Sequence, residues 1–393
     1  MKKYLKLPVY LACMALSVIG FGCSDDDDDP VDETDPKTEA LKPVVENYVN
    51  NIVIATYNKL ADATIDLQEK IEALKADKTN ANLEAAANAW KDTRKHWELS
   101  EAFLFGAVAD FGIDPHIDTW PLDEVQFKKL LVNKDFMEQL AGEDGDVWAS
   151  QYLGISLLGF HGIENILFAE GATKDVSIIT DAEMDYAVAV GGDLRNQCVR
   201  LEAAWAGLDN VTSAKQALIE EKELEIGRTS SEMSYGEEML KAGEAGSGYR
   251  TVTAAATQIL EYAFVIADEV GNVKIGTAAN ESASDEDKNY IESPYSYNSL
   301  EDFKDNIQSI ENAYLGTAYG VSGASVSEYL AGVNADADKA VKDAIAASYA
   351  AIEKIPYPFA KNYTSAEADE AVTVIGETLA NALTKAKSAL LAE

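Results

Sequence analysis

Apolar residues recur at steps of three and four positions from Leu41 almost to the C-terminus, and this spacing constrains the fold more than any other feature. Such a period places the apolar side chains on one face of an α-helix. Alternating runs of the β type are scarce, and Ala, Leu, Glu and Lys are abundant, which favours helices over strands. We therefore predict an all-α fold.

The length of the chain, 393 residues, is enough for two domains of ordinary size. The helical segments group into two bundles, so we expect an N-terminal helical bundle over residues 41–210 and a C-terminal helical bundle over residues 211–393. Helical bundles bury apolar stripes, and they commonly build cofactor sites from side chains on facing helices.

The first residues have the pattern of an export signal. Three lysines among the first six residues precede an apolar stretch at 7–22, which is too short to span a membrane comfortably and is typical of a signal peptide. Gly22 and Cys23 resemble a bacterial lipobox, in which the cysteine carries the lipid. We therefore expect residues 1–22 to be a lipoprotein signal peptide and Cys23 to be the lipidation site.

An acidic segment follows this cysteine. The run from Asp25 to Asp29 resembles the surface-export signal of Bacteroidetes lipoproteins, and we expect residues 23–40 to form a disordered tether. These features predict a lipid-anchored protein at the outer membrane or cell surface of a Gram-negative cell. A secreted protein with an acidic tether is the alternative.

The charge balance excludes one class of partner. Lys and Arg total 32 against 68 Asp and Glu, for a formal net charge of −36. Binding of nucleic acid needs clustered cations that neutralise phosphates, so we expect no nucleic acid partner. An acidic surface keeps an exported domain soluble, and it also concentrates cations around the protein.

Two charged residues lie on the apolar face of a helix that we predict over residues 83–104. The residues that follow the steps of this face are Leu83, Ala87, Trp90, Arg94, Trp97, Glu101 and Leu104. A charge on a core-facing stripe is costly unless it is paired or bound to a ligand. Arg94 and Glu101 are therefore either a structural ion pair or part of a site, where Arg94 orients Glu101 or grips an anionic chelator.

A second helix, predicted over residues 151–168, is apolar almost all round and should be central. His161 and Glu164, its only histidine and carboxylate, lie one turn apart on one face. An imidazole with a carboxylate suits iron, zinc or copper, and the alternative is a hydrogen bond that satisfies a buried histidine. Gly159 and Gly162 weaken a helix, which indicates close backbone packing beside the pair.

Further polar residues lie outside these two helices. The loop over residues 114–121 contains His116 and Asp118, which can reach a site, and Glu269 offers another carboxylate. An ordinary polar connection is the alternative for this loop. His96 falls beside the apolar stripe, and we expect it to be exposed.

Several segments resemble the imelysin family. The run from Gly159 to Glu164 resembles the family signature Gly-x-His-x-x-Glu, and the run from Trp90 to Gly106 resembles its first-bundle motif. The other segments that look like family sequences are Asp118 to Pro121, Ile266 to Gly271 and Glu292 to Ser296. The resemblance spans most of residues 41–393.

The resemblance implies two helical bundles with the signature site near their interface. His161 and Glu164 match the signature, Arg94 and Glu101 match the first-bundle motif, and Ser293 falls in a later segment. The family includes iron-regulated proteins, relatives of a periplasmic iron-uptake component and proteins described as cell-surface peptidases. The resemblance therefore implies metal capture or peptide hydrolysis.

We predict an exported lipoprotein that binds iron or another metal, free or as a small chelate, in iron uptake with an uptake-system partner protein. The predicted metal ligands are His161, Glu164 and Glu101, and the predicted surrounding residues are Arg94, Asp118, Glu269 and Ser293. A carboxylate-rich set with one imidazole suits iron better than a soft copper site, and we rank zinc below iron.

Two alternatives to iron capture stay open. A cell-surface metallopeptidase usually needs three protein ligands and a base. The motif His-Glu-x-x-His is absent, and the reversed motif would need a histidine at Asn165. A protein that binds haem or another small ligand through His161 is the second alternative, but haem leaves Glu164 unexplained.

Overall fold

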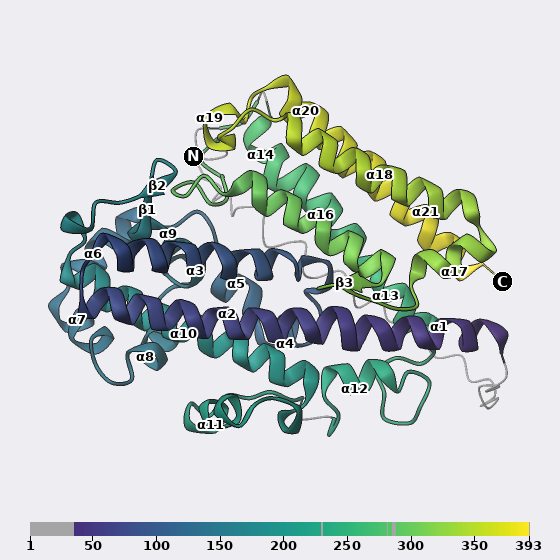
Figure 1. Cartoon of the computed structure of the whole chain (residues 1–393), viewed down its shortest axis with the longest axis horizontal. Helices are drawn as coiled ribbons and strands as arrows, with labels where there is room; N and C mark the ends of the chain where they lie inside the picture. Colours follow the sequence, from purple (N-terminus) through teal and green to yellow (C-terminus); the bar gives the residue numbers. More distant parts are fainter. Residues whose placement is uncertain (1–34, 229–230, 281, 285–287, 393) are drawn as a thin grey trace, which may run out of the picture. The chain divides into compact units, whose positions relative to one another are not determined.

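The computed structural model describes residues 35–228, 231–280, 282–284 and 288–392 (Figure 1). Its regular structure is almost entirely helical, as predicted. The described strands form two antiparallel hairpins, β1 (Phe168–Ala169) with β2 (Ala172–Thr173) and β3 (Thr317–Ala318) with β4 (Val321–Ser322). Within these ranges no helix combines the length and the apolar character needed to cross a membrane.

A long helical rod opens the described chain. It consists of α1 (Pro36–Asn47), the π-helical segment η2 (Tyr48–Val53) and α2 (Ile54–Ala76), which run end to end in Figure 1. The side chain of Asp35 caps the rod, and Pro36 stands at the first helical position, where a missing N–H costs nothing. Residues 36–40 are therefore helical and not part of a disordered tether. Cys23 and the predicted signal peptide lie outside the described residues.

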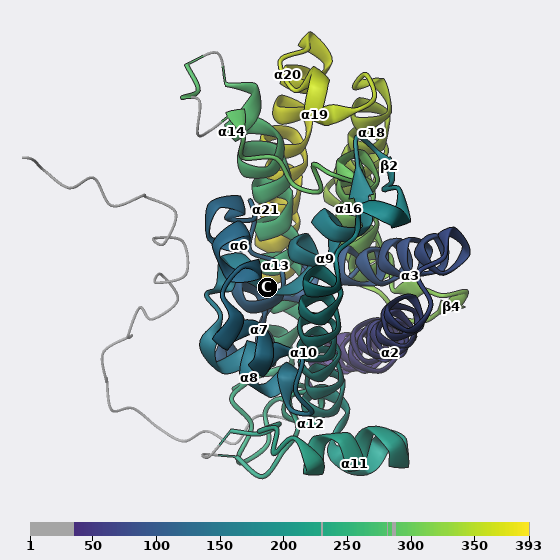
Figure 2. The same cartoon turned by 90° about the vertical axis from the view of Figure 1, so that its left-hand side faces the viewer.

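The helices up to Ala206 form a group around α2. The elements of this group are α3 (Asn80–Glu98), η3 (Glu101–Phe103), α4 (Ala107–Phe111), α5 (Ile113–Ile117), α6 (Glu124–Leu131), α7 (Lys134–Leu140), α8 (Gly145–Tyr152), η4 (Ile155–Leu157), α9 (Gly159–Leu167), η5 (Val176–Ile178) and α10 (Asp181–Ala206). Helix α2 packs against α3 and α10, and α8 and α9 pack against α10 (Figure 2). This packing sets α3 and α9 beside each other.

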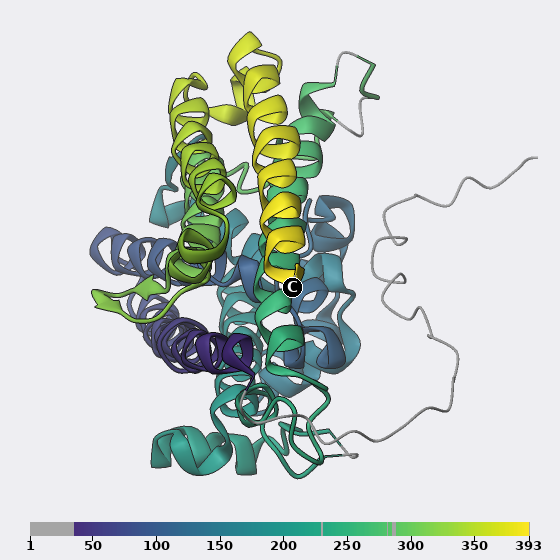
Figure 3. The ribbon, with the colours of Figure 1, turned by 90° about the vertical axis from the view of Figure 1, so that its right-hand side faces the viewer.

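Three later elements, η6 (Leu208–Asn210), α11 (Ser213–Glu221) and α12 (Tyr235–Leu240), pack against α10. The helices that follow pack mainly on one another. They are α13 (Val252–Glu269), η7 (Val270–Ile275), α14 (Gly276–Ala279), α16 (Ser299–Leu315), α17 (Val326–Val333), α18 (Ala335–Lys354), α19 (Phe359–Asn362), α20 (Ala366–Val372), η8 (Thr373–Leu379) and α21 (Ala380–Leu391). Helix α21 packs against α13 and α18 (Figure 3). Because α1 also packs against α13, the rod contacts both groups. The boundary near residue 210 stays a prediction.

The helix predicted over residues 151–168 is interrupted. Helix α8 ends at Tyr152, and α9 begins only at Gly159, whose φ of +69° disfavours any side chain. A Cβ at Gly159 would lie 1.7 Å from the carbonyl oxygen of Ile117, and one at Gly162 would lie 2.0 Å from the hydroxyl of Tyr186. The close packing expected at these glycines is confirmed, whereas the continuous helix is wrong.

The helix predicted over residues 83–104 also ends early. Helix α3 stops at Glu98, and a turn at Leu99 and Ser100 leads into η3, which carries Glu101. The predicted loop at 114–121 begins as part of α5. These two changes bring the end of α3, η3 and the residue after α5 to one buried place.

Candidate metal centre

A buried arginine organises the centre. Arg94 lies on α3 with its side chain fully buried. Its guanidinium forms ion pairs with Glu98, Asp118, Glu292 and, at 3.7 Å, Asp302. Arg94 is thus paired in the core, which satisfies the requirement that a charge on the apolar face of this helix be paired or bound. Among the described residues, its ion-pair partners are these four carboxylates and do not include Glu101.

A lysine from the second half of the chain supplies another buried cation. Lys274 belongs to η7, and its side chain is 1% exposed. Its Nζ lies 3.3 Å from Glu98 Oε2, 3.4 Å from Glu101 Oε1 and 3.1 Å from Glu292 Oε1. Glu98 and Glu292 therefore contact both buried cations, Arg94 and Lys274.

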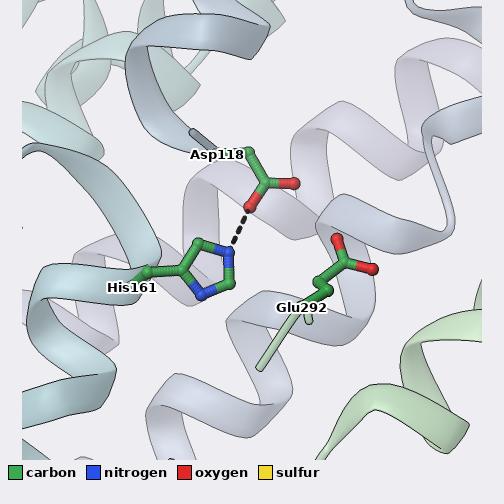
Figure 4. Close-up of side chains that lie close together, drawn as sticks. All are labelled: Asp118, His161 and Glu292. Carbon is green, nitrogen blue, oxygen red and sulfur yellow. Dashed lines mark ion pairs between the residues drawn. The ribbon is translucent and has the colours of Figure 1, made fainter. Parts of the chain in front are cut away.

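The signature histidine faces the same carboxylates. On α9, His161 Nε2 lies 3.2 Å from Asp118 Oδ1, the contact drawn in Figure 4. Asp118, His161 and Glu292 each offer one ligand atom, and these atoms all lie within 4.8 Å of one another. All three residues are buried. One imidazole and two carboxylates from three distant segments therefore converge on one point.

Glu164 contacts the other ring nitrogen of His161. Glu164 Oε2 lies 2.9 Å from His161 Nδ1. Glu164 Oε1 accepts hydrogen bonds from the backbone N–H of Tyr295 at 3.0 Å and from the N–H and hydroxyl of Ser296 at 2.8 and 2.7 Å. Both oxygens are engaged, so Glu164 orients the imidazole of His161 and offers no free ligand atom.

Asp118 stands at the middle of the cluster. Its Oδ2 accepts a 2.7 Å hydrogen bond from the indole Nε1 of Trp97, and its Oδ1 contacts Arg94 and His161. A second set of close carboxylates, Glu98 and Glu101 with Asp118, shares this residue with the first. Asp118 was only a weaker candidate from the sequence, and the structure makes it central.

Negative charge exceeds positive charge in the centre. The six buried carboxylates are Glu98, Glu101, Asp118, Glu164, Glu292 and Asp302. The cationic side chains named above are Arg94, Lys274 and His161. Such an excess is costly in a low-dielectric interior unless protons or a bound cation reduce it.

The pKa values of these groups reflect the excess of negative charge in the centre. Burial raises the pKa of Glu101, Glu292 and Asp302. Although burial opposes its charge, Asp118 keeps a pKa well below its usual range because Arg94 and His161 lie beside it. Burial likewise opposes an imidazolium, but the carboxylates of Asp118 and Glu164 raise the pKa of His161 to about 9.

Other predicted residues have different surroundings. The hydroxyl of Ser293 donates to Asp302, so Ser293 supports the loop that carries Glu292. Glu269 is half-buried, and burial raises its pKa. His116 Nε2 lies 2.8 Å from Asp193 on α10, and His96, which we expected to be exposed, is half-buried against Tyr319.

Sequence reasoning missed four residues of the centre. They are Glu98, Lys274, Glu292 and Asp302. Glu98 stands four positions after Arg94, a spacing at which helical side chains meet, and this signal could have found it. Lys274 and Glu292 are almost two hundred positions from Arg94 in sequence, and no local pattern links them.

The comparisons with known proteins identify the family. The imelysin profile matches residues 53–390. The chain belongs to the imelysin family. Iron-regulated protein A of Synechococcus elongatus is 27% identical over 353 residues, which cover 87% of this chain and 86% of that protein.

Solved structures agree with this imelysin assignment. The crystal structure described as an iron-regulated protein A precursor from Parabacteroides distasonis has a TM-score of 0.76 at 26% identity, covering 91% of this chain and 97% of that one. An imelysin-like protein from Psychrobacter arcticum has a TM-score of 0.58 at 13% identity over 90% of this chain and 94% of its own, which shows a shared fold.

The donor set of this imelysin centre fits iron. Glu292 Oε2 is buried and has no hydrogen-bond partner in the described part of the chain, and the contact of His161 Nε2 with Asp118 is an ion pair without hydrogen-bond geometry. Imidazole nitrogen and carboxylate oxygen together suit iron. A zinc site of two histidines is not formed among the described residues, because His116 and His96 bind other partners.

Proposed function

We propose that this imelysin-family protein captures iron at Asp118, His161 and Glu292, and that Glu164 orients His161. The observation that supports this most is the convergence of these three donors in a buried cluster with more carboxylates than cations. Bound iron would supply the missing positive charge. A carboxylate and an imidazole already held in place need little reorganisation to bind it.

The buried cations have a defined part in this proposal. Arg94 fixes the carboxylates of Asp118 and Glu292, since its planar guanidinium carries several donors in a rigid geometry. It thereby keeps two of the three ligands in place when no metal is bound. A capture site needs such preorganisation, because ordering ligands during binding weakens affinity.

We further propose that capture takes place outside the cell membrane. The signal peptide and lipidated Cys23 predicted from the sequence would tether the domain to the outer membrane or cell surface. The net charge of −36 would attract cations toward the tethered domain. Two relatives whose names describe iron-regulated proteins support a role in iron uptake, where a partner protein would receive the metal.

Thermal unfolding of the full-length protein in detergent tests the proposal. We expect anaerobic Fe²⁺ to raise the midpoint more than Zn²⁺, Mn²⁺, Cu²⁺ or Ca²⁺. A ligand at a hundred times its Kd stabilises the folded state by about 2.7 kcal/mol. The shift should vanish in His161→Ala and Glu292→Gln.

His116→Ala is the matched control, because His116 also contacts a buried aspartate but lies outside the centre. It should keep the iron-induced shift. A well-folded wild-type protein that no metal stabilises would contradict the proposal, as would an undiminished iron shift in His161→Ala.

A further inference from the structure

We infer that Lys274 is a built-in cation that occupies a second cation position of the carboxylate cluster and limits the centre to one metal ion. This inference rests on the proposed function and concerns the stoichiometry of the same centre. It gives Lys274 a specificity role that the iron ligands alone do not define.

The two carboxylate sets of the centre share Asp118. The first set also contains His161 and Glu292, and the second set also contains Glu98 and Glu101. A carboxylate shared between two ligand sets is the usual arrangement of two-metal sites, in which the ions stand about 3.5–4 Å apart. By its ligands alone, the cluster could therefore hold two ions.

The ammonium of Lys274 lies where the second ion would be. It contacts Glu98 and Glu101 of the second set at 3.3 and 3.4 Å, and Glu292 of the first set at 3.1 Å. An ammonium carries three donors on one compact charge, and here three carboxylate oxygens surround it. To bind a metal, these oxygens would have to lie about 2.0–2.2 Å from the ion. The ammonium stands in the place of that ion and keeps it out.

The backbone keeps Lys274 in this position. Its segment η7 packs against η8 so closely that a Cβ on Gly271 would lie 2.3 Å from the backbone nitrogen of Gly376. With its side chain 1% exposed, Lys274 cannot turn into solvent without moving this packed segment. Ion pairs with Glu98, Glu101 and Glu292 hold the ammonium at this place.

The metal content of Lys274→Met tests the inference. Purified full-length proteins are loaded with anaerobic Fe²⁺, freed of excess metal by gel filtration and counted by native mass spectrometry. We expect one ion on the wild type and two on Lys274→Met. Adding Glu101→Gln to Lys274→Met removes a ligand of the second position and should restore one ion.

Lys215→Met is the matched control. Lys215 is equally buried and binds Glu202 and Asp62 at 2.6 Å, but it belongs to α11, outside the centre. This variant should bind one ion, so a general effect of losing a buried lysine can be recognised. Lys274→Ala, whose short side chain cannot reach these carboxylates, should also bind two ions and serves if the methionine variant fails to fold.

The outcomes separate the inference from the proposed function. One ion on both the wild type and a folded Lys274 variant would overturn the inference and leave iron capture intact. Two ions on the wild type would also overturn the inference and leave iron capture intact. No ion on any of the proteins would overturn both.

Discussion

The backbone N–H of Ser296 donates a 2.8 Å hydrogen bond to Glu164 Oε1, which ties the signature helix α9 to a loop 132 positions further along the chain. The other oxygen of Glu164 holds His161 Nδ1. The orientation of the signature imidazole therefore depends on a distant segment. The same loop carries Glu292. This one segment therefore provides the proposed ligand Glu292 and also holds Glu164, which orients His161.

We predict that Glu164→Gln weakens iron binding by about 10- to 100-fold without unfolding the protein. The amide can still accept the bonds from the loop, but it supplies no charge behind His161. Competition with a chelator of known affinity measures the change. Glu170→Gln is the control, because Glu170 is exposed and pairs with Lys361. If Glu164→Gln instead abolishes binding as fully as Glu292→Gln does, Glu164 is a direct ligand.

Iron affinity should rise with pH. The pKa of His161 is about 9 in the metal-free protein, and an imidazolium must lose a proton before its nitrogen binds a metal. Below that pH, affinity should increase by up to about tenfold per pH unit, and binding should release about one proton. Titration calorimetry in buffers with different ionisation enthalpies measures the release. Binding without proton release would show that His161 is not a ligand.

The stability of the metal-free protein should depend on pH in the opposite direction. The folded state raises the pKa of His161 above its ordinary value of 6.5, so folded protein binds the proton more tightly than unfolded protein does. The resulting stabilisation is complete below pH 6.5 and is lost as pH rises through about 9. Urea unfolding across this range should show the loss in the wild type, and His161→Gln should show a smaller loss, because buried carboxyl groups with raised pKa values still titrate in it.

We predict that Arg94→Met lowers the free energy of unfolding by about 3–5 kcal/mol, because it leaves buried carboxylates without their cation. Lys70→Met is the control, since its pair with Asp66 is solvent-exposed and contributes little to stability. Urea unfolding without metal measures both. Equal, small effects would mean that the carboxylates are already protonated around Arg94.

Gly159→Ala should disrupt the signature helix. The residue has φ +69°, and a Cβ would collide with the carbonyl oxygen of Ile117 at 1.7 Å. Gly154→Ala is the comparison, because nothing lies within 4 Å of its Cβ position and its φ is −71°. We expect the first variant to lower the yield of folded protein and the thermal midpoint, and the second to change the midpoint little. Similar midpoints would refute the strain argument.

The sequence by itself determined the helical class and half of the centre. Its three- and four-residue spacing predicts helices because the side chains of one helix face repeat at that period. The same spacing marked Arg94 as buried and placed His161 one turn from Glu164. These relations are local, and each depends only on the geometry of a single helix.

Only the tertiary structure decided which residues share the centre. Asp118 follows a short helix, Lys274 lies in a π-helical segment and Glu292 in a loop, and none of these positions has a period that points inward. The end of α3 at Glu98 places Glu101 in η3, where it contacts Lys274 and not Arg94. Long-range packing makes these choices, because the cost of burying charge is settled only when all partners from distant segments are assembled.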